Sequence, residues 1–260
     1  MATTRIQFVL AILAWSIVGA ASSWAADRVG IVLLHDKAES PADLAAVKDA
    51  LTAADFVVAT PEMCWARTRM YDARLADCLQ AVEASVTKLA GEGVPRVLVA
   101  GKGIGARAAL VFAQGHPGLA GVVVLGPVLD LSLLARQPDV AWRIAAARAA
   151  TLYGQGNSRV RYVDRAADGW PINVNASSLA YLDFVDPAGP LALGAKLRKL
   201  GVPVLWVAGA GDYMTASRFA NLFARNAGNR FVPADSGASG AGAASLPGLI
   251  ADWLAPPPSQ

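Results

Sequence analysis

One short stretch of the chain has the glycine spacing of two known chemical devices. Residues 98–110 read LVAGKGIGARAAL, an apolar segment followed by a glycine-dense turn and an alanine-rich segment. Gly101, Gly103 and Ala106 match the dinucleotide pattern G-x-G-x-x-A, in which a helix N-terminus holds a pyrophosphate. The same turn matches the nucleophile elbow G-x-S-x-G, which presents a serine for attack, except that Gly103 stands at the serine position.

The dinucleotide interpretation lacks its acidic partner. Such sites place a carboxylate at the end of the next strand, where it binds a ribose hydroxyl. The next apolar run, residues 121–125, is followed by Gly126 and Pro127, and the nearest acid is Asp130. Gly103, by contrast, tolerates the positive φ of an elbow. The turn therefore favours an elbow without its nucleophile, and dinucleotide binding is kept as an alternative.

Four segments, taken in order, resemble parts of the α/β-hydrolases, most of all their small esterase-like and dienelactone-hydrolase-like members. They are residues 33–37 (LLHDK), 60–71 (TPEMCWARTRMY), 99–105 (VAGKGIG) and 204–212 (VLWVAGAGD). In that family the corresponding segments are the oxyanion loop LLHGK, the loop that follows the next strand, the elbow VAGHSLG and the strand that leads to the acid of the triad. The resemblance gives the acid's position to Asp212 and covers most of the chain after residue 25.

The chain departs from the family at the groups that perform the chemistry. Gly103 replaces the nucleophile, Ser236 stands where the catalytic histidine is expected, and both histidines of the chain lie well before that position. At the oxyanion positions, which are His35, Asp36 and Ile104, an aspartate replaces the family's glycine. An inward-pointing carboxylate there would oppose a developing oxyanion. Without the serine and its base, we expect no triad-type hydrolysis.

These departures predict an exported pseudo-hydrolase that binds a small ligand or a protein partner. The ligand-binding candidates are His35, at the mouth of the expected cleft, Lys102, at a helix N-terminus suited to anions, and the aromatic residues Trp65 and Tyr71. The alternative is a divergent hydrolase in which His35 or a carboxylate activates water or the substrate. No cofactor and no metal site is expected.

The elements that must position these groups alternate in type. Repeated strand–helix units predict an α/β fold with a mostly parallel sheet covered by helices on both faces, and they place ligands at the carboxyl ends of the strands. The alternation breaks at residues 126–127, and residues 128–200 are expected to form a helical cap with a loop at 157–175. The expected strands are residues 29–34, 56–59, 96–100, 121–125, 203–208 and 230–232.

The first 25 residues predict export. Arg5, an apolar run of about 15 residues and Ser23-Trp24-Ala25 have the order of a signal peptide with its cleavage site, and an uncleaved anchor is the alternative. Residues 26–260 would then form one domain of a secreted, periplasmic protein, with no stable membrane insertion after signal removal. Cys64 and Cys78 are the only cysteines, and in an exported protein an even count favours a disulfide over two reduced thiols.

Charge excludes one class of partner. The chain has 23 Lys and Arg residues against 20 Asp and Glu residues, which gives a formal net charge of +3. The basic residues are scattered and form no run. Nucleic-acid binding needs a strong basic patch, so we expect none.

Overall fold

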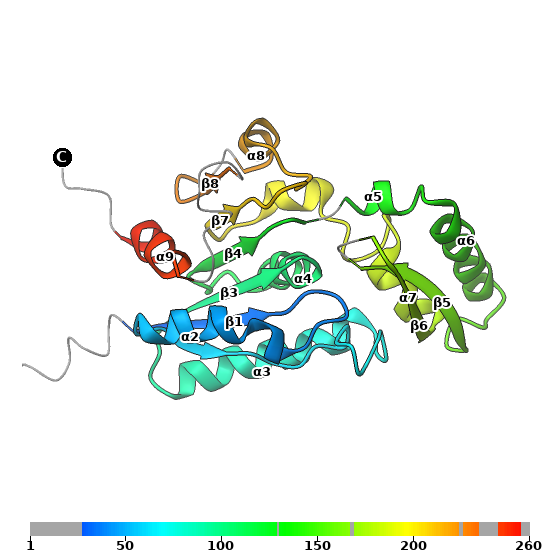
Figure 1. Cartoon of the computed structure of the whole chain (residues 1–260), viewed down its shortest axis with the longest axis horizontal. Helices are drawn as coiled ribbons and strands as arrows, with labels where there is room; N and C mark the ends of the chain where they lie inside the picture. The colour runs from blue at the N-terminus through cyan, green and yellow to red at the C-terminus, as the bar shows by residue number, and fades with distance from the viewer. Residues whose placement is uncertain (1–27, 129, 167–168, 224–225, 234–243, 256–260) are drawn as a thin grey trace, which may run out of the picture.

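Parallel strands form the central sheet of the computed structural model, which describes residues 28–128, 130–166, 169–223, 226–233 and 244–255. Within that part of the chain the sheet has six strands in the order β2-β1-β3-β4-β7-β8, and every pair is parallel (Figure 1). The strands are β1 (Val29–Leu34), β2 (Val57–Ala59), β3 (Arg96–Lys102), β4 (Gly121–Leu125), β7 (Val204–Val207) and β8 (Arg230–Val232). The predicted parallel sheet is confirmed.

Helices cover both faces of this sheet, and its central strands are therefore continuous apolar runs in the sequence. In β1, Ile31 and Leu33 face one helical layer while Val32 and Leu34 face the other, and all four are 0% exposed. The first layer contains η1 (Pro41–Leu44), α2 (Ala45–Ala53) and α9 (Leu246–Leu254). The second layer contains α3 (Leu75–Gly91), α4 (Ile104–Ala113) and α8 (Ala216–Phe223).

The strand order reverses beside β1. From β1 the chain goes out to β2 on one side and then crosses to β3 on the other. In parallel α/β sheets the loops at such a reversal diverge and leave room for a site at the carboxyl ends of the strands. Here those loops are the one that carries Asp36, after β1, and the turn at Gly103, after β3.

A cap is inserted between β4 and β7, and its elements α5, α6, α7, β5 and β6 gather at one end of the molecule, on the right in Figure 1. It consists of α5 (Leu131–Leu134), α6 (Pro138–Leu152), β5 (Arg159–Arg165), β6 (Pro171–Ser177), α7 (Ser178–Val185) and η2 (Gly194–Lys199). Residues 157–175, expected as a loop, instead contain most of an antiparallel hairpin, with Tyr162 opposite Val174. The cap is therefore mixed rather than helical.

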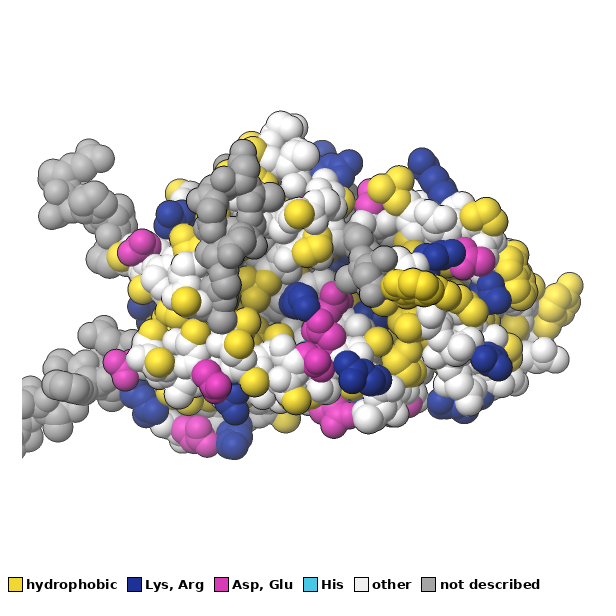
Figure 2. Space-filling model, in the orientation of Figure 1, with side chains coloured by type: hydrophobic (Ala, Val, Ile, Leu, Met, Phe, Trp, Pro, Cys, Tyr) yellow, Lys and Arg dark blue, Asp and Glu magenta, His cyan; other side chains and the backbone are white. Residues whose placement is uncertain are grey.

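The cap carries the exposed large hydrophobic side chains of the described residues, and Figure 2 shows hydrophobic side chains over that end of the molecule. They are Leu133, Trp142, Leu152, Tyr153, Val160 and Trp170. Leu152 and Tyr153 are 86% and 82% exposed. In the described part of the chain, no helix combines the length and apolarity needed to cross a bilayer.

Candidate functional site

The turn after β3 has the backbone of an elbow. Gly103 has φ 54° and ψ −114° and lies between the last residue of β3 and the first residue of α4. A Cβ on Gly101 would lie 2.4 Å from the carbonyl carbon of Gly105, and one on Gly105 would lie 2.6 Å from the carbonyl oxygen of His35. The flanking glycines therefore allow the strand, the helix and the loop after β1 to touch, as a tight elbow requires.

The carboxylate of Asp36 fills the space above this turn. A Cβ built on Gly103 would lie 2.1 Å from Asp36 Cγ and Oδ1 and 2.2 Å from Oδ2. These distances are far below a van der Waals contact, so a serine at position 103 and this placement of Asp36 exclude each other. The missing side chain at position 103 is what makes room for the carboxylate.

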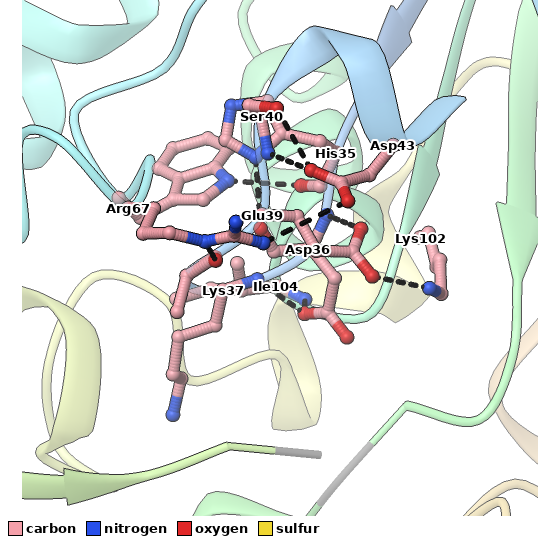
Figure 3. Close-up of polar contacts among 11 residues, drawn as sticks. His35, Asp36, Lys37, Glu39, Ser40, Asp43, Arg67, Lys102 and Ile104 are labelled. Atoms are coloured by element: carbon pink, nitrogen blue, oxygen red, sulfur yellow. Dashed lines mark hydrogen bonds and ion pairs between the residues drawn. The ribbon is translucent and has the colours of Figure 1, made fainter. Parts of the chain in front are cut away.

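Backbone amides hold this carboxylate as they would hold an oxyanion. Asp36 Oδ1 accepts hydrogen bonds from the backbone N–H of Ile104, at 2.9 Å, and of Lys37, at 2.7 Å (Figure 3). In elbow-type hydrolases the oxyanion hole is made by the amide after the nucleophile, here Ile104, and by an amide of a neighbouring βα loop. The N-terminus of α4 adds a favourable dipole. In this chain both of these backbone N–H groups thus donate to the carboxylate of Asp36.

Solved structures with a similar arrangement of elements include an esterase, a lipase and a thioesterase domain. The carboxyl esterase of Bacillus coagulans is 12% identical over 88% of this chain and 91% of its own, with a TM-score of 0.61. The monoacylglycerol lipase of Paleococcus ferrophilus is 14% identical over 86% and 93%, with a TM-score of 0.60. A thioesterase domain from the curacin biosynthetic pathway is 12% identical over 86% and 92%, with a TM-score of 0.53.

The chain has the α/β-hydrolase fold. No family model and no curated protein matches the sequence itself. The fold assignment therefore rests on the similarity of the structures.

Burial raises the pKa of Asp36, and the hydrogen bonds from the Ile104 and Lys37 amides act in the opposite direction. The side chain belongs to a residue that is 6% exposed, so the desolvation of the charged form is the larger effect. The carboxylate is thus held in a site that is shaped for an anion but is poorly hydrated.

His35, in the loop after β1, is 0% exposed. The prediction that it lies at the mouth of a cleft is therefore wrong. Its Nδ1 lies 2.8 Å from the carbonyl oxygen of Asp36, and its Nε2 accepts a hydrogen bond from the backbone N–H of Met63, at 3.2 Å. A carbonyl only accepts and an amide only donates, so these contacts fix a neutral imidazole with a proton on Nδ1. Burial lowers the pKa of His35. Neither ring nitrogen is left to act on a substrate.

The two aromatic ligand candidates also lie inside the protein. Trp65 and Tyr71 are 0% exposed; Trp65 Nε1 donates to the carbonyl oxygen of His35 at 2.9 Å, and the Tyr71 ring stacks on Phe184 of the cap at 4.3 Å. The predicted disulfide between Cys64 and Cys78 is confirmed, with 5.7 Å between the two Cα atoms. This loop therefore joins the sheet to the cap and contributes no wall to the cavities described below.

Lys102, the fourth ligand candidate, is paired within the protein. Its Nζ lies 2.5 Å from Glu39 Oε1, and Glu39 Oε2 accepts the backbone N–H of Asp36 at 3.0 Å (Figure 3). Lys102 therefore stabilises the loop after β1 through Glu39, and its positive charge is neutralised by the Glu39 carboxylate.

A buried ion pair closes the cap onto the oxyanion loop. Lys37 Nζ lies 2.7 Å from Asp164 Oδ2 on β5, with side-chain exposures of 8% and 0%. Tyr71 donates its hydroxyl to the same Asp164 oxygen at 2.5 Å, and burial raises the pKa of that tyrosine. The cavity left over the elbow is only about 30 Å³, enough for one water molecule.

Asp212 lies after β7, where the acid of a triad is expected. Its side-chain hydrogen bonds, however, are with residues close to it in the sequence. Its Oδ2 accepts Trp206 Nε1 at 3.1 Å and its Oδ1 accepts the backbone N–H of Met214 at 3.0 Å. Burial raises the pKa of Asp212. Ser236 and the predicted signal segment lie outside the described residues.

A larger cavity, of about 790 Å³, lies between the cap and α8, and sequence reasoning missed it. It shares Arg107 and Leu131 with the small cavity over the elbow. Its polar side chains come from α4, from α5 and the residue before it, from η2, and from α8 and the segment before it. Because these segments are far apart in the sequence, no local motif marks the cavity.

Proposed function

We propose that the chain is a non-catalytic pseudo-hydrolase whose role is to bind a ligand. One observation carries this proposal: the Asp36 carboxylate stands where a nucleophile's side chain would stand and takes the amides of Ile104 and Lys37. Acyl transfer needs a nucleophile, a base beside it and an empty anion site. Position 103 has no side chain, His35 has both ring nitrogens bonded, and the anion site holds a carboxylate.

The same contacts oppose the dinucleotide alternative. A pyrophosphate in a G-x-G-x-x-A turn takes the amides at the N-terminus of the following helix. Here the first of those amides, that of Ile104, donates to Asp36. The cavity above it measures about 30 Å³, close to the volume of one water molecule, so a dinucleotide would find neither this donor nor enough space at the turn.

A small molecule is the ligand that we favour. Ligand pockets commonly measure about 300–1,000 Å³, and the cavity between the cap and α8, at about 790 Å³, lies in that range. This larger cavity has room for a ligand, whereas the Asp36 carboxylate fills the space above the elbow.

Ester hydrolysis tests the proposal directly. Residues 26–260 are purified and assayed with p-nitrophenyl esters of short and medium chain length and with a fluorophosphonate probe that labels activated serines. We expect no turnover above the buffer rate and no labelling, in the wild type and in Asp36→Asn alike. Turnover in the wild type that is lost in Asp36→Asn or in His35→Ala would instead establish the divergent hydrolase.

We also propose that the protein is exported and works in the periplasm. The disulfide between Cys64 and Cys78 supports this, because structural disulfides persist in oxidising compartments. Expression of the full chain should yield a periplasmic protein whose mass corresponds to a start at Ala26. A full-length protein retained in the membrane fraction would support the uncleaved anchor.

A further inference from the structure

The larger cavity is lined on several sides by positive charge. Arg107 comes from α4, Arg198 from η2 and Arg218 from α8. Arg107 is 5% exposed and is set into the wall, whereas Arg198 and Arg218 are exposed to solvent. Among the described lining residues, Asp130 is the one carboxylate against these three guanidinium groups.

Two of these guanidinium groups are oriented by one tyrosine. The Cζ atoms of Arg107 and Arg218 lie 5.5 Å and 5.3 Å from the centre of the Tyr213 ring. Arg107 Nη1 also donates to the carbonyl oxygen of Leu191, and Arg218 Nη1 to that of Tyr213, both at 2.9 Å. Ring and carbonyl contacts fix the planes of both groups before any ligand arrives, which lowers the entropic cost of binding.

The cavity's single carboxylate has a structural partner. Asp130 Oδ1 accepts the backbone N–H of Ser132 at 2.8 Å and caps α5. In the described part of the chain, neither Arg198 nor Arg218 forms an ion pair. The cavity therefore has a net positive lining, and an anion would gain from entering it.

The remaining walls are partly apolar. They are formed by Leu131, Pro187, Leu193 and Leu222. An occupant that fits this lining has a negative group for the arginines and an apolar body for the leucines.

We propose that this cavity binds a small organic oxyanion, a carboxylate or a phosphate monoester with a short apolar body, and that Arg198 and Arg218 hold its charged group. Guanidinium groups suit both kinds of oxyanion because their donors match two oxygens at once. The proposal rests on the proposed function, since it names the ligand class of a binding protein.

Calorimetric titration tests it with four probes that share one alkyl chain: octanoate, octyl phosphate, octanol and octylamine. We expect the two anions to bind, to weaken as salt is added, and to bind more tightly than the alcohol and the amine. The double variant Arg198→Gln/Arg218→Gln should lose about ten-fold or more in affinity for the anions, the size of one lost charge-assisted hydrogen bond. Arg159→Gln/Arg161→Gln, on β5, makes the same change in net charge outside the cavity and should bind like the wild type.

Three outcomes overturn the proposal: no binding of either anion, equal binding of octanol, or equal losses in the two double variants. A preference for octanoate or for octyl phosphate identifies which oxyanion the site selects and supports it. Ester turnover in the same wild-type preparation would overturn the pseudo-hydrolase itself, whereas missing anion binding without turnover would overturn only this assignment.

Discussion

Gly103 and Asp36 act as one unit. Because Gly103 has no side chain, there is space above the elbow, and the Asp36 carboxylate fills it. The same carboxylate accepts the hydrogen bonds of the Ile104 and Lys37 backbone N–H groups. A buried carboxylate elsewhere would be costly, whereas here two backbone donors satisfy one of its oxygens.

Gly103→Ala should reveal this reciprocity. The added Cβ meets Asp36 and enters an unfavourable backbone region, so we expect the free energy of unfolding to fall by about 2–4 kcal/mol. Asp36→Ala removes the atoms that clash, so in that background the same change should cost about 1–2 kcal/mol less. Urea unfolding of the four proteins measures the coupling, and strict additivity would mean that Asp36 does not occupy this volume in solution.

Gly103→Ser alone should not create an esterase. The serine would have no base, because His35 uses both ring nitrogens on backbone groups, and the serine's own Cβ would collide with the Asp36 carboxylate. Hydrolysis of p-nitrophenyl acetate by this variant should equal that of the wild type. A large gain in rate would reveal a base that these contacts do not identify.

Asp36 should also make stability depend on pH. Its folded pKa lies above the unfolded value of 3.8, so the native state binds this proton more tightly than the unfolded state does. The contribution is fully present below the unfolded pKa and is lost as the pH rises through the folded pKa. Urea unfolding from about pH 3.5 to pH 7 should therefore show the wild type losing stability relative to Asp36→Asn. A difference that stays constant across this range would contradict the raised pKa.

At the scale of elements, the sequence predicted what depends on local pattern. The continuous apolar runs of β1 and β4 match the predicted ranges because both strands are buried by their neighbours, which hydrophobicity alone encodes. The hairpin of β5 and β6 was missed since only one side of it is buried and arginines and asparagines cover the other, so its alternation is short and polar.

The disulfide should be a main support of the loop between β2 and α3. It closes a segment with a sequence separation of 14, for which chain entropy gives about 3 kcal/mol. Cys64→Ser/Cys78→Ser should lose about that much stability in urea, and reduction of the wild type should produce the same loss. A reduced protein as stable as the oxidised one would show that packing of the loop against the cap suffices.

The ion pair between the oxyanion loop and β5 should respond differently to single and double substitution. Lys37→Met leaves the buried Asp164 carboxylate without its cation, which typically costs about 3–5 kcal/mol. Lys37→Met/Asp164→Asn removes both charges and keeps an acceptor for Tyr71, so it should be the more stable of the two variants. The urea midpoints of the two variants test this prediction. A lower midpoint for the double variant would mean that water solvates the ion pair.

At the scale of the whole molecule, the sequence located the positions of the site but not their contacts. Gly103, Asp36 and Asp212 could be placed because each follows a strand. That His35 points into the core, or that arginines from α4, η2 and α8 line one cavity, depends on long-range packing that a motif does not record.

Dinucleotides should leave the melting temperature unchanged. The backbone N–H of Ile104 is already hydrogen-bonded and the cavity over the elbow measures only about 30 Å³, so we expect NAD and FAD to have no site there. Differential scanning fluorimetry of Arg198→Gln/Arg218→Gln with each nucleotide in excess checks this without the proposed anion site, and a dose-dependent rise in this variant would restore the dinucleotide alternative.

The occupancy of the elbow by Asp36 would also oppose any gain of serine-type catalysis at this turn. Such a gain would require a smaller residue at position 36, a serine at position 103 and a nearby imidazole, and each change alone would either destabilise the protein or add no activity. Evolution of catalysis at this turn would therefore pass through less stable or inactive intermediates. A new binding specificity could arise more easily in the arginine-lined cavity, where single substitutions leave the elbow unchanged.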